Sequence, residues 1–110
     1  MSSHKNIMEK HSLKEIIGLL QDRKISEKEI LQHYFSRINK FNPSLKALVS
    51  LRSIDEVLND LENLKRCSMH KKTKSLFGIP LAVKDLIDVK GLPTTYGVPK
   101  YKNNVAKKNS

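Results

Sequence analysis

Apolar side chains recur every three or four residues in three stretches of the chain, the spacing that places them on one face of a helix. The first stretch predicts a short helix over residues 13–22. Ser12 and Glu15 stand at its start as a capping box, in which each side chain bonds the other residue's backbone N–H. Before this helix, residues 1–11 are polar and aperiodic, and we expect them to form a flexible tail.

Two further helices are predicted in the same way, each introduced by its own Ser-x-x-Glu capping box. The second begins at Ser26 and is expected to end near Asn39, because Asn42-Pro43 disfavours continuation of a helix. The third is expected over residues 53–66, with its apolar side chains on one face.

Two apolar stretches have a different pattern that favours strands. Leu45–Leu51 is short and partly alternating, whereas Leu76–Val89 is almost continuously apolar, as in a strand buried on both faces of a covered sheet. Glycines and a proline at residues 91–97 then indicate turns. We therefore predict an α/β fold with about three helices and two to three strands. Because so apolar a strand needs neighbouring strands and covering layers, the chain is expected to be the opening part of something larger.

The chain is strongly basic, with 21 Lys or Arg against 11 Asp or Glu and a net charge of +10. Two stretches lack acidic residues, Lys65–Lys74 and Val89–Ser110. Nucleic-acid-binding chains usually add aromatic side chains or a recognisable module, but aromatic residues make up only 5% of this chain. We therefore favour solvated surface charge over nucleic-acid binding, which stays an alternative.

The single cysteine, Cys67, excludes a disulfide within the chain and is expected to be a free thiol. No apolar run reaches the roughly 20 residues that span a bilayer, and the N-terminus does not read as a secretory signal. These features favour a cytoplasmic protein that does not enter the membrane. Cys67 and His70 could supply two metal ligands, but a structural zinc site needs four. We expect no metal and no cofactor.

Lys84 is the chemically unusual residue, because apolar residues lie on both sides of the Lys84-Asp85 pair. A lysine in such a run is expected to be partly buried, and desolvation favours the neutral amine that can act as a base. The alternative is a structural lysine at the end of a strand, whose ammonium reaches water and pairs with Asp85. Asp85 and Asp88 do not form an obvious acid–base pair, and positioning or turn hydrogen bonding is the better interpretation.

A specific motif surrounds this lysine. Residues 77–85 read F-G-I-P-L-A-V-K-D, and residues 87–97 read I-D-V-K-G-L-P-T-T-Y-G. This sequence resembles the amidase signature family, in which G-I-P-x-x-x-K-D is followed by I-D-x-x-G-x-P-T-T-x-G. Ile25-Ser26 and Asn42-Pro43 also match the family's helical start, so the resemblance covers roughly residues 12–110. It implies that this range is the incomplete N-terminal part of an amidase domain, with a mixed sheet covered by helices.

The resemblance also implies a chemistry. Family members cleave or transfer at amide bonds with a serine nucleophile, a second serine in a cis peptide, and a lysine. The lysine takes the proton from the bridging serine, which activates the nucleophile. Backbone N–H groups of a loop rich in glycine and serine form the oxyanion hole. The family's lysine is the one in the K-D pair, so Lys84 is the expected catalytic residue here.

The chain departs from the family pattern in one respect: it contains no G-G-S-S-like run that could supply the two serines. We therefore expect it to carry the lysine of the triad and to be inactive alone, as a truncated gene, one half of a split frame, or a remnant. A downstream chain could supply the serines. Two branches of the family stay open: general amidases, which the motif favours, and the glutamine-hydrolysing component of the glutamyl-tRNA(Gln) amidotransferase. A non-catalytic module whose basic loops contact an acidic partner is the alternative from another class.

Overall fold

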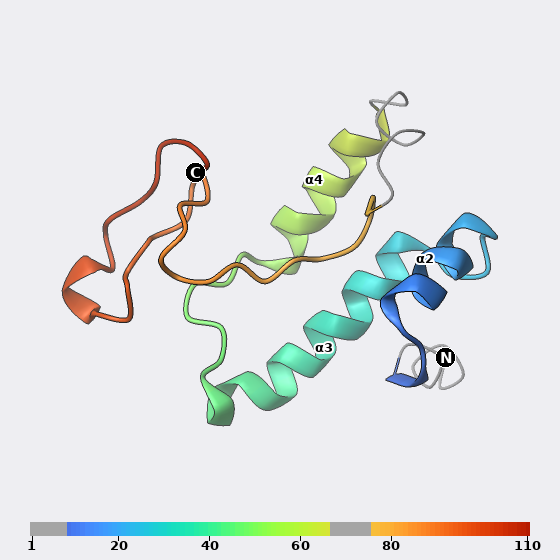
Figure 1. Cartoon of the computed structure of the whole chain (residues 1–110), viewed down its shortest axis with the longest axis horizontal. Coiled ribbons are helices and arrows are strands. Elements are labelled where there is room, and N and C mark those ends of the chain that lie inside the picture. Colours follow the sequence, from blue (N-terminus) through green and yellow to red (C-terminus); the bar gives the residue numbers. More distant parts are fainter. Residues whose placement is uncertain (1–8, 67–75) are drawn as a thin grey trace. The chain divides into compact units, whose positions relative to one another are not determined.

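The computed structural model of the chain describes residues 9–66 and 76–110, and these divide into two compact units. The first unit holds residues up to Ser44 together with Arg52–Pro80, and the second holds Leu45–Leu51 together with Leu81–Ser110. Figure 1 labels the three longer helices of the described residues, α2, α3 and α4. A single short 3-10 helix, η1 (Pro99–Tyr101), follows in the second unit.

Helix α2 spans Leu13–Gln21, as the apolar spacing predicts. The Ser12 N–H donates to Glu15 Oε1 over 3.0 Å, and the Glu15 N–H donates to Ser12 Oγ over 3.2 Å. The predicted capping box is therefore confirmed. Both N–H groups belong to the helix start, where the backbone has no helical partners, so the box removes two unsatisfied donors.

Helix α3 spans Glu27–Leu45 and starts at its predicted capping box: the Glu29 N–H donates to Ser26 Oγ over 3.1 Å, and the Ser26 N–H donates to Glu29 Oε1 over 3.3 Å. The expected end near residue 39 is wrong, because Pro43 lies inside the last helical turn. Near a helix end, proline disturbs only the final hydrogen bonds, and the helix can tolerate it there. Lys46, with a φ of 51°, then turns the backbone out of the helix.

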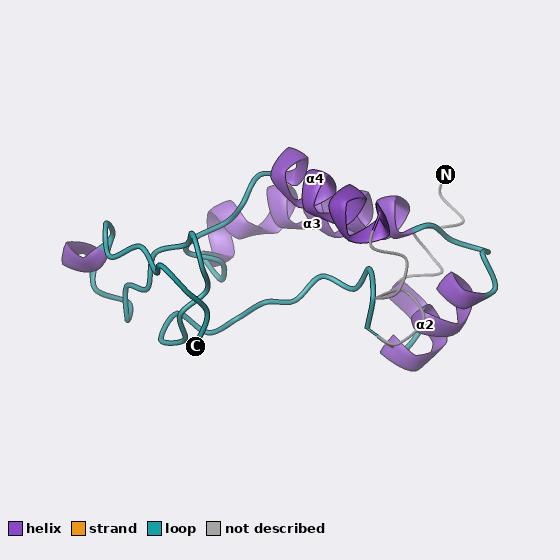
Figure 2. Ribbon diagram, turned by 90° about the horizontal axis from the view of Figure 1, so that it is seen from above, coloured by secondary structure: helices purple, strands orange, loops and turns teal. Residues whose placement is uncertain are grey.

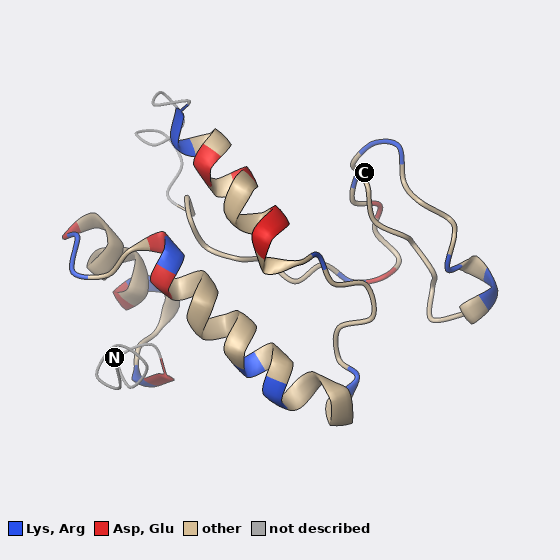
Figure 3. Cartoon of the chain, turned by 180° about the vertical axis from the view of Figure 1, so that it is seen from behind, with Lys and Arg blue, Asp and Glu red and all other residues tan. Residues whose placement is uncertain are grey.

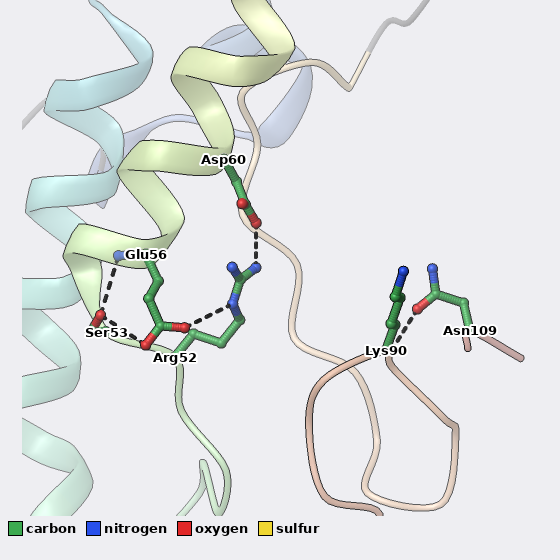
Figure 4. A network of polar contacts seen from close by, with 6 residues as sticks. All are labelled: Arg52, Ser53, Glu56, Asp60, Lys90 and Asn109. Carbon is green, nitrogen blue, oxygen red and sulfur yellow. Dashed lines mark hydrogen bonds and ion pairs between the residues drawn. The ribbon is translucent and has the colours of Figure 1, made fainter. Parts of the chain in front are cut away.

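Helix α4 spans Ile54–Arg66, as predicted. The Glu56 N–H donates to Ser53 Oγ over 3.2 Å at its start. Arg52 lies beside the same turn, with Nη1 2.6 Å from Asp60 Oδ2 and Nε 3.7 Å from Glu56 Oε2 (Figure 4). Acidic residues in a first turn also favour the positive end of the helix dipole, so local sequence explains where α4 begins.

The core of the first unit lies between α2 and the start of α3. It is formed by Ile16, Ile25 and Ile30, of which Ile30 is fully buried, and Ile79 packs against them. Ile79 follows a turn in which its N–H donates to the Leu76 carbonyl over 3.1 Å. The Gly-Ile part of the sequence motif is therefore anchored on the helices. None of the helices in the described ranges is long and apolar enough to cross a membrane.

The two predicted strands are wrong for the residues that the structure describes (Figure 2). Leu45 ends α3 and the residues after it are irregular, while 79–84 run without regular structure between two turns. In both described ranges, strand pairing is limited to one isolated antiparallel bridge, between Pro93 and Val105. A strand is stabilised by neighbours that pair with it and pack on it, and an apolar run alone does not supply them.

Gly78 provides a test of this anchoring. Its φ is +84°, and a Cβ added there would lie 2.4 Å from Glu27 Cγ. We expect Gly78→Ala to lower the free energy of unfolding of the helical unit by at least about 1 kcal/mol, because the left-handed conformation strains any L side chain. Chemical denaturation followed by circular dichroism measures it.

Gly18→Ala is the matched control, because Gly18 lies inside α2 and an added Cβ meets nothing within 4 Å. This change should raise stability by about 0.5–1 kcal/mol, the usual advantage of alanine over glycine in a helix. Equal effects of the two substitutions would contradict the close approach of Gly78 to α3.

Candidate functional site

Lys84 lies in the second unit, and its side chain is exposed. The sequence predicted partial burial, and that prediction is wrong for this chain. Val83 and Leu86 on either side of the Lys84-Asp85 pair are exposed as well, and Leu81 is 85% exposed. The apolar run that was expected to desolvate the amine therefore has nothing packed over it within these residues.

The Asp85 carboxylate binds Thr95, ten residues further along. The Thr95 N–H donates to Asp85 Oδ1 over 2.8 Å, and the Thr95 hydroxyl donates to Asp85 Oδ2. The Tyr96 N–H donates to the Asp85 carbonyl oxygen over 2.9 Å. The structure thus contradicts the ion pair of Asp85 with Lys84 and supports the interpretation of Asp85 as a positioning group.

A second carboxylate repeats this arrangement. The Thr94 hydroxyl donates to Asp88 Oδ1 over 2.6 Å. Thr94 and Thr95 are 1% and 6% exposed, and they are the buried residues of the second unit. Two adjacent threonines therefore face two carboxylates three residues apart. We refer to the Asp85–Thr95 and Asp88–Thr94 contacts as the two clamps.

A tight turn follows the clamps directly. The Val98 N–H donates to the Thr95 carbonyl over 2.8 Å, and the two central residues, Tyr96 and Gly97, have φ values of 53° and 76°. Positive φ at both central positions defines a type I′ turn, in which glycine is the favoured second residue. The Gly97 N–H also donates to Thr95 Oγ1 over 3.2 Å, which satisfies the hydroxyl as an acceptor. This turn presents Thr95 to Asp85.

The C-terminal residues close the loop with further polar contacts. The Thr94 N–H donates to the Asn104 carbonyl over 2.9 Å, and Asn104 Nδ2 donates to the Thr94 carbonyl over 3.0 Å. The Asp88 N–H donates to Ser110 Oγ over 2.9 Å. The Lys90 N–H donates to Asn109 Oδ1 over 2.7 Å (Figure 4). Hydrogen bonds rather than apolar contacts hold this unit together.

Charge in this unit is divided between bonded acids and exposed lysines. The Thr95 hydroxyl, and then its backbone N–H, lower the pKa of Asp85 from its ordinary value of 3.8. Lysine positions appear in blue along the last part of the chain (Figure 3). The exposed ones are Lys90, Lys100, Lys102, Lys107 and Lys108.

Several predicted features lie outside the described residues, including Cys67, His70 and most of the basic stretch 65–74. Within the described ranges, no three His, Cys, Asp or Glu side chains are grouped so that they could hold a metal. The sequence interpretation missed Thr94 and Thr95, the two buried polar residues. Their signal was present as two threonines that follow two aspartates at spacings of six and ten residues.

This loop is matched by known proteins. The family model for amidases matches residues 29–110. The first of two relatives is the A component of the glutamyl-tRNA(Gln) amidotransferase of Hahella chejuensis, which is 34% identical over 105 residues; these cover 89% of this chain and 22% of that protein. The second, an acylamidase of Rhodococcus erythropolis, is 32% identical over 100 residues, which cover 90% of this chain and 21% of that enzyme.

The chain belongs to the amidase family, because the family match includes most of its residues. It spans about a fifth of the length of the curated relatives it matches. No solved structure matches the chain. The resemblance that the K-D and P-T-T residues carry is therefore confirmed at the level of the family.

The lowered pKa of Asp85 predicts how the Asp85–Thr95 clamp depends on pH. An acid with a depressed folded pKa stabilises the folded form above its unfolded pKa, and this contribution is lost as pH falls through the folded value. The clamp should therefore be intact at neutral pH and open only below the ordinary value of 3.8. Carbon-13 NMR of the Asp85 carboxyl measures the midpoint.

Thr95→Val removes the hydroxyl that contributes most to this shift and should move the midpoint upward. Thr95→Ser keeps a hydroxyl and should leave it low. An Asp85 midpoint at or above 3.8 in the unsubstituted chain would contradict the clamp.

Proposed function

We propose that the chain is the N-terminal portion of an amidase-family hydrolase of C–N amide bonds, with Lys84 as its catalytic base. The observation that supports this best is the coincidence of the family match with the Lys84 loop, where the motif residues Asp85, Thr94 and Thr95 take part in the two clamps. The proposal places the protein in the cytoplasm.

In the proposed reaction, the neutral amine of Lys84 takes a proton from a serine hydroxyl, which in turn activates the serine nucleophile. Both serines and the oxyanion loop come from polypeptide outside these residues, which contain no G-G-S-S-like run. The same polypeptide would cover Leu81 and Val83, which are exposed here. Covering them would desolvate the amine and favour the neutral form that a base requires.

Two substrate classes follow from the relatives. The acylamidase supports a general amide substrate, and the amidotransferase component supports glutamine hydrolysis within an assembly. The chain resembles both at similar identity. Assaying the completed enzyme with a simple aryl acylamide and with glutamine distinguishes them, because only the second substrate carries an α-amino acid group.

A non-catalytic interaction module is the alternative from another class, and the exposed lysines after residue 89 favour it. Binding through those charges should weaken steeply as salt increases. A completed enzyme whose activity requires Lys84 would argue against this alternative.

The 110 residues alone should not hydrolyse simple amides or glutamine above background, because they supply a base without the serine pair. Loss of a nucleophile costs several orders of magnitude in rate. The measurement is product release from an aryl acylamide and from glutamine. Turnover by this chain that disappears in Lys84→Ala would contradict the prediction and indicate a nucleophile among its own serines.

Activity should appear when the chain replaces the matching N-terminal part of the Rhodococcus acylamidase. In this chimaera, Lys84→Arg should fail nearly as completely as Lys84→Ala, because arginine stays protonated and cannot act as the base. Lys107→Ala, which removes an exposed lysine of the same unit, is the control and should cost little. Near-full activity of the Lys84→Arg chimaera would overturn the assignment.

A further inference from the structure

We propose that Asp85 and Thr95 are positioning residues that hold the Lys84 backbone in place and keep the neighbouring carboxylate away from the lysine amine. This inference rests on the proposed function, in which Lys84 is the base. It concerns how the amine is presented, and neither Asp85 nor Thr95 is assigned a role in proton transfer.

The first part of the argument is the backbone around Lys84. The Ile87 N–H donates to the Lys84 carbonyl over 3.1 Å, and the Tyr96 N–H donates to the Asp85 carbonyl over 2.9 Å. Two successive carbonyl groups are thus held by two different parts of the loop. The side chain of Lys84 is long and exposed, so fixing its backbone is the contribution that these residues make to its placement.

The second part is the carboxylate itself. Asp85 directly follows Lys84, and a carboxylate that bonds an ammonium group stabilises the protonated amine. Both carboxylate oxygens instead accept hydrogen bonds from Thr95, one from its N–H and one from its hydroxyl. Thr95 therefore removes the nearest acid in the sequence as a partner that would keep the lysine charged.

The third part excludes an acid–base role for Asp85. Hydrogen bonds to a carboxylate favour its ionised form, and those from Thr95 lower the pKa of Asp85. An acid that stays ionised at neutral pH has no proton to donate, and its acceptor sites are already used by Thr95. The geometry therefore favours positioning.

The other clamp supplies a matched control within the same loop. Thr94 is buried, as Thr95 is, and its hydroxyl donates to Asp88 Oδ1. Its backbone N–H and carbonyl bond Asn104, away from Lys84 and Asp85. Thr94→Val and Thr95→Val remove the same hydroxyl from adjacent buried residues, and only Thr95→Val frees the carboxylate beside Lys84.

The first measurement uses the 110-residue chain. Backbone order at Lys84 and Asp85 is measured by the 15N heteronuclear NOE in the unsubstituted chain and in three variants. Thr95→Val should lower the NOE at both residues, Thr95→Ser should restore it, and Thr94→Val should leave it unchanged. Unchanged order in Thr95→Val would overturn the inference, whatever the enzyme activity.

The second measurement uses the acylamidase chimaera. Thr95→Val should lower kcat about 10- to 100-fold, the cost of a small misplacement of a catalytic group, while KM changes less than about twofold. Thr95→Ser should recover most of the rate, and Thr94→Val should cost less than about threefold. A general loss of folding would instead lower the amount of active enzyme in both valine variants.

The outcomes separate the two claims. If Lys84→Ala leaves the chimaera active, the proposed function fails. If Lys84 is required but Thr95→Val keeps its full kcat, the positioning role is wrong and the proposed function stands. If the chimaera has no activity, the NOE comparison in the 110-residue chain decides whether Thr95 orders Lys84.

Discussion

The second unit depends on a pair of buried hydroxyl groups, because its described residues include no buried hydrophobic side chain. Thr94 and Thr95 each satisfy a carboxylate, and the turn and the C-terminal residues are bonded around them. Hydrogen bonds contribute little net stability when water competes for the same groups. Such a loop can have a defined shape while its apolar side chains, such as Leu81, stay in contact with water.

This arrangement explains why the environment expected for Lys84 is absent. The chain supplies the lysine, its backbone placement and the restraint on Asp85, but nothing that removes the amine from water. The matched relatives are about five times longer, and an amide hydrolase needs a site from which water is excluded. The proposed division is therefore physical: these residues present the base, and other polypeptide supplies both the nucleophile and the apolar cover.

The elements that the sequence predicted well are those set by local interactions. The helix starts at Ser12, Ser26 and Ser53 follow from contacts between residues three positions apart, and these need no tertiary partner. The end of α3 was missed because proline is tolerated in a last turn. The strands failed for the opposite reason, since the pattern of Leu76–Val89 describes neighbours that the described residues do not contain. The threonine clamps depend on contacts six and ten residues apart, which no helical or strand period reveals.

The central claim is that polar clamps, without an apolar core, hold the loop that presents Lys84. Amide hydrogen exchange of the 110-residue chain at neutral pH tests it most directly. The account predicts slower exchange at Thr95 and Tyr96, whose N–H groups donate to Asp85, than at Leu81–Val83. Exchange as fast at Thr95 and Tyr96 as in a peptide would contradict the clamp. Strong protection throughout Leu81–Val83 in a monomer would contradict the missing apolar cover.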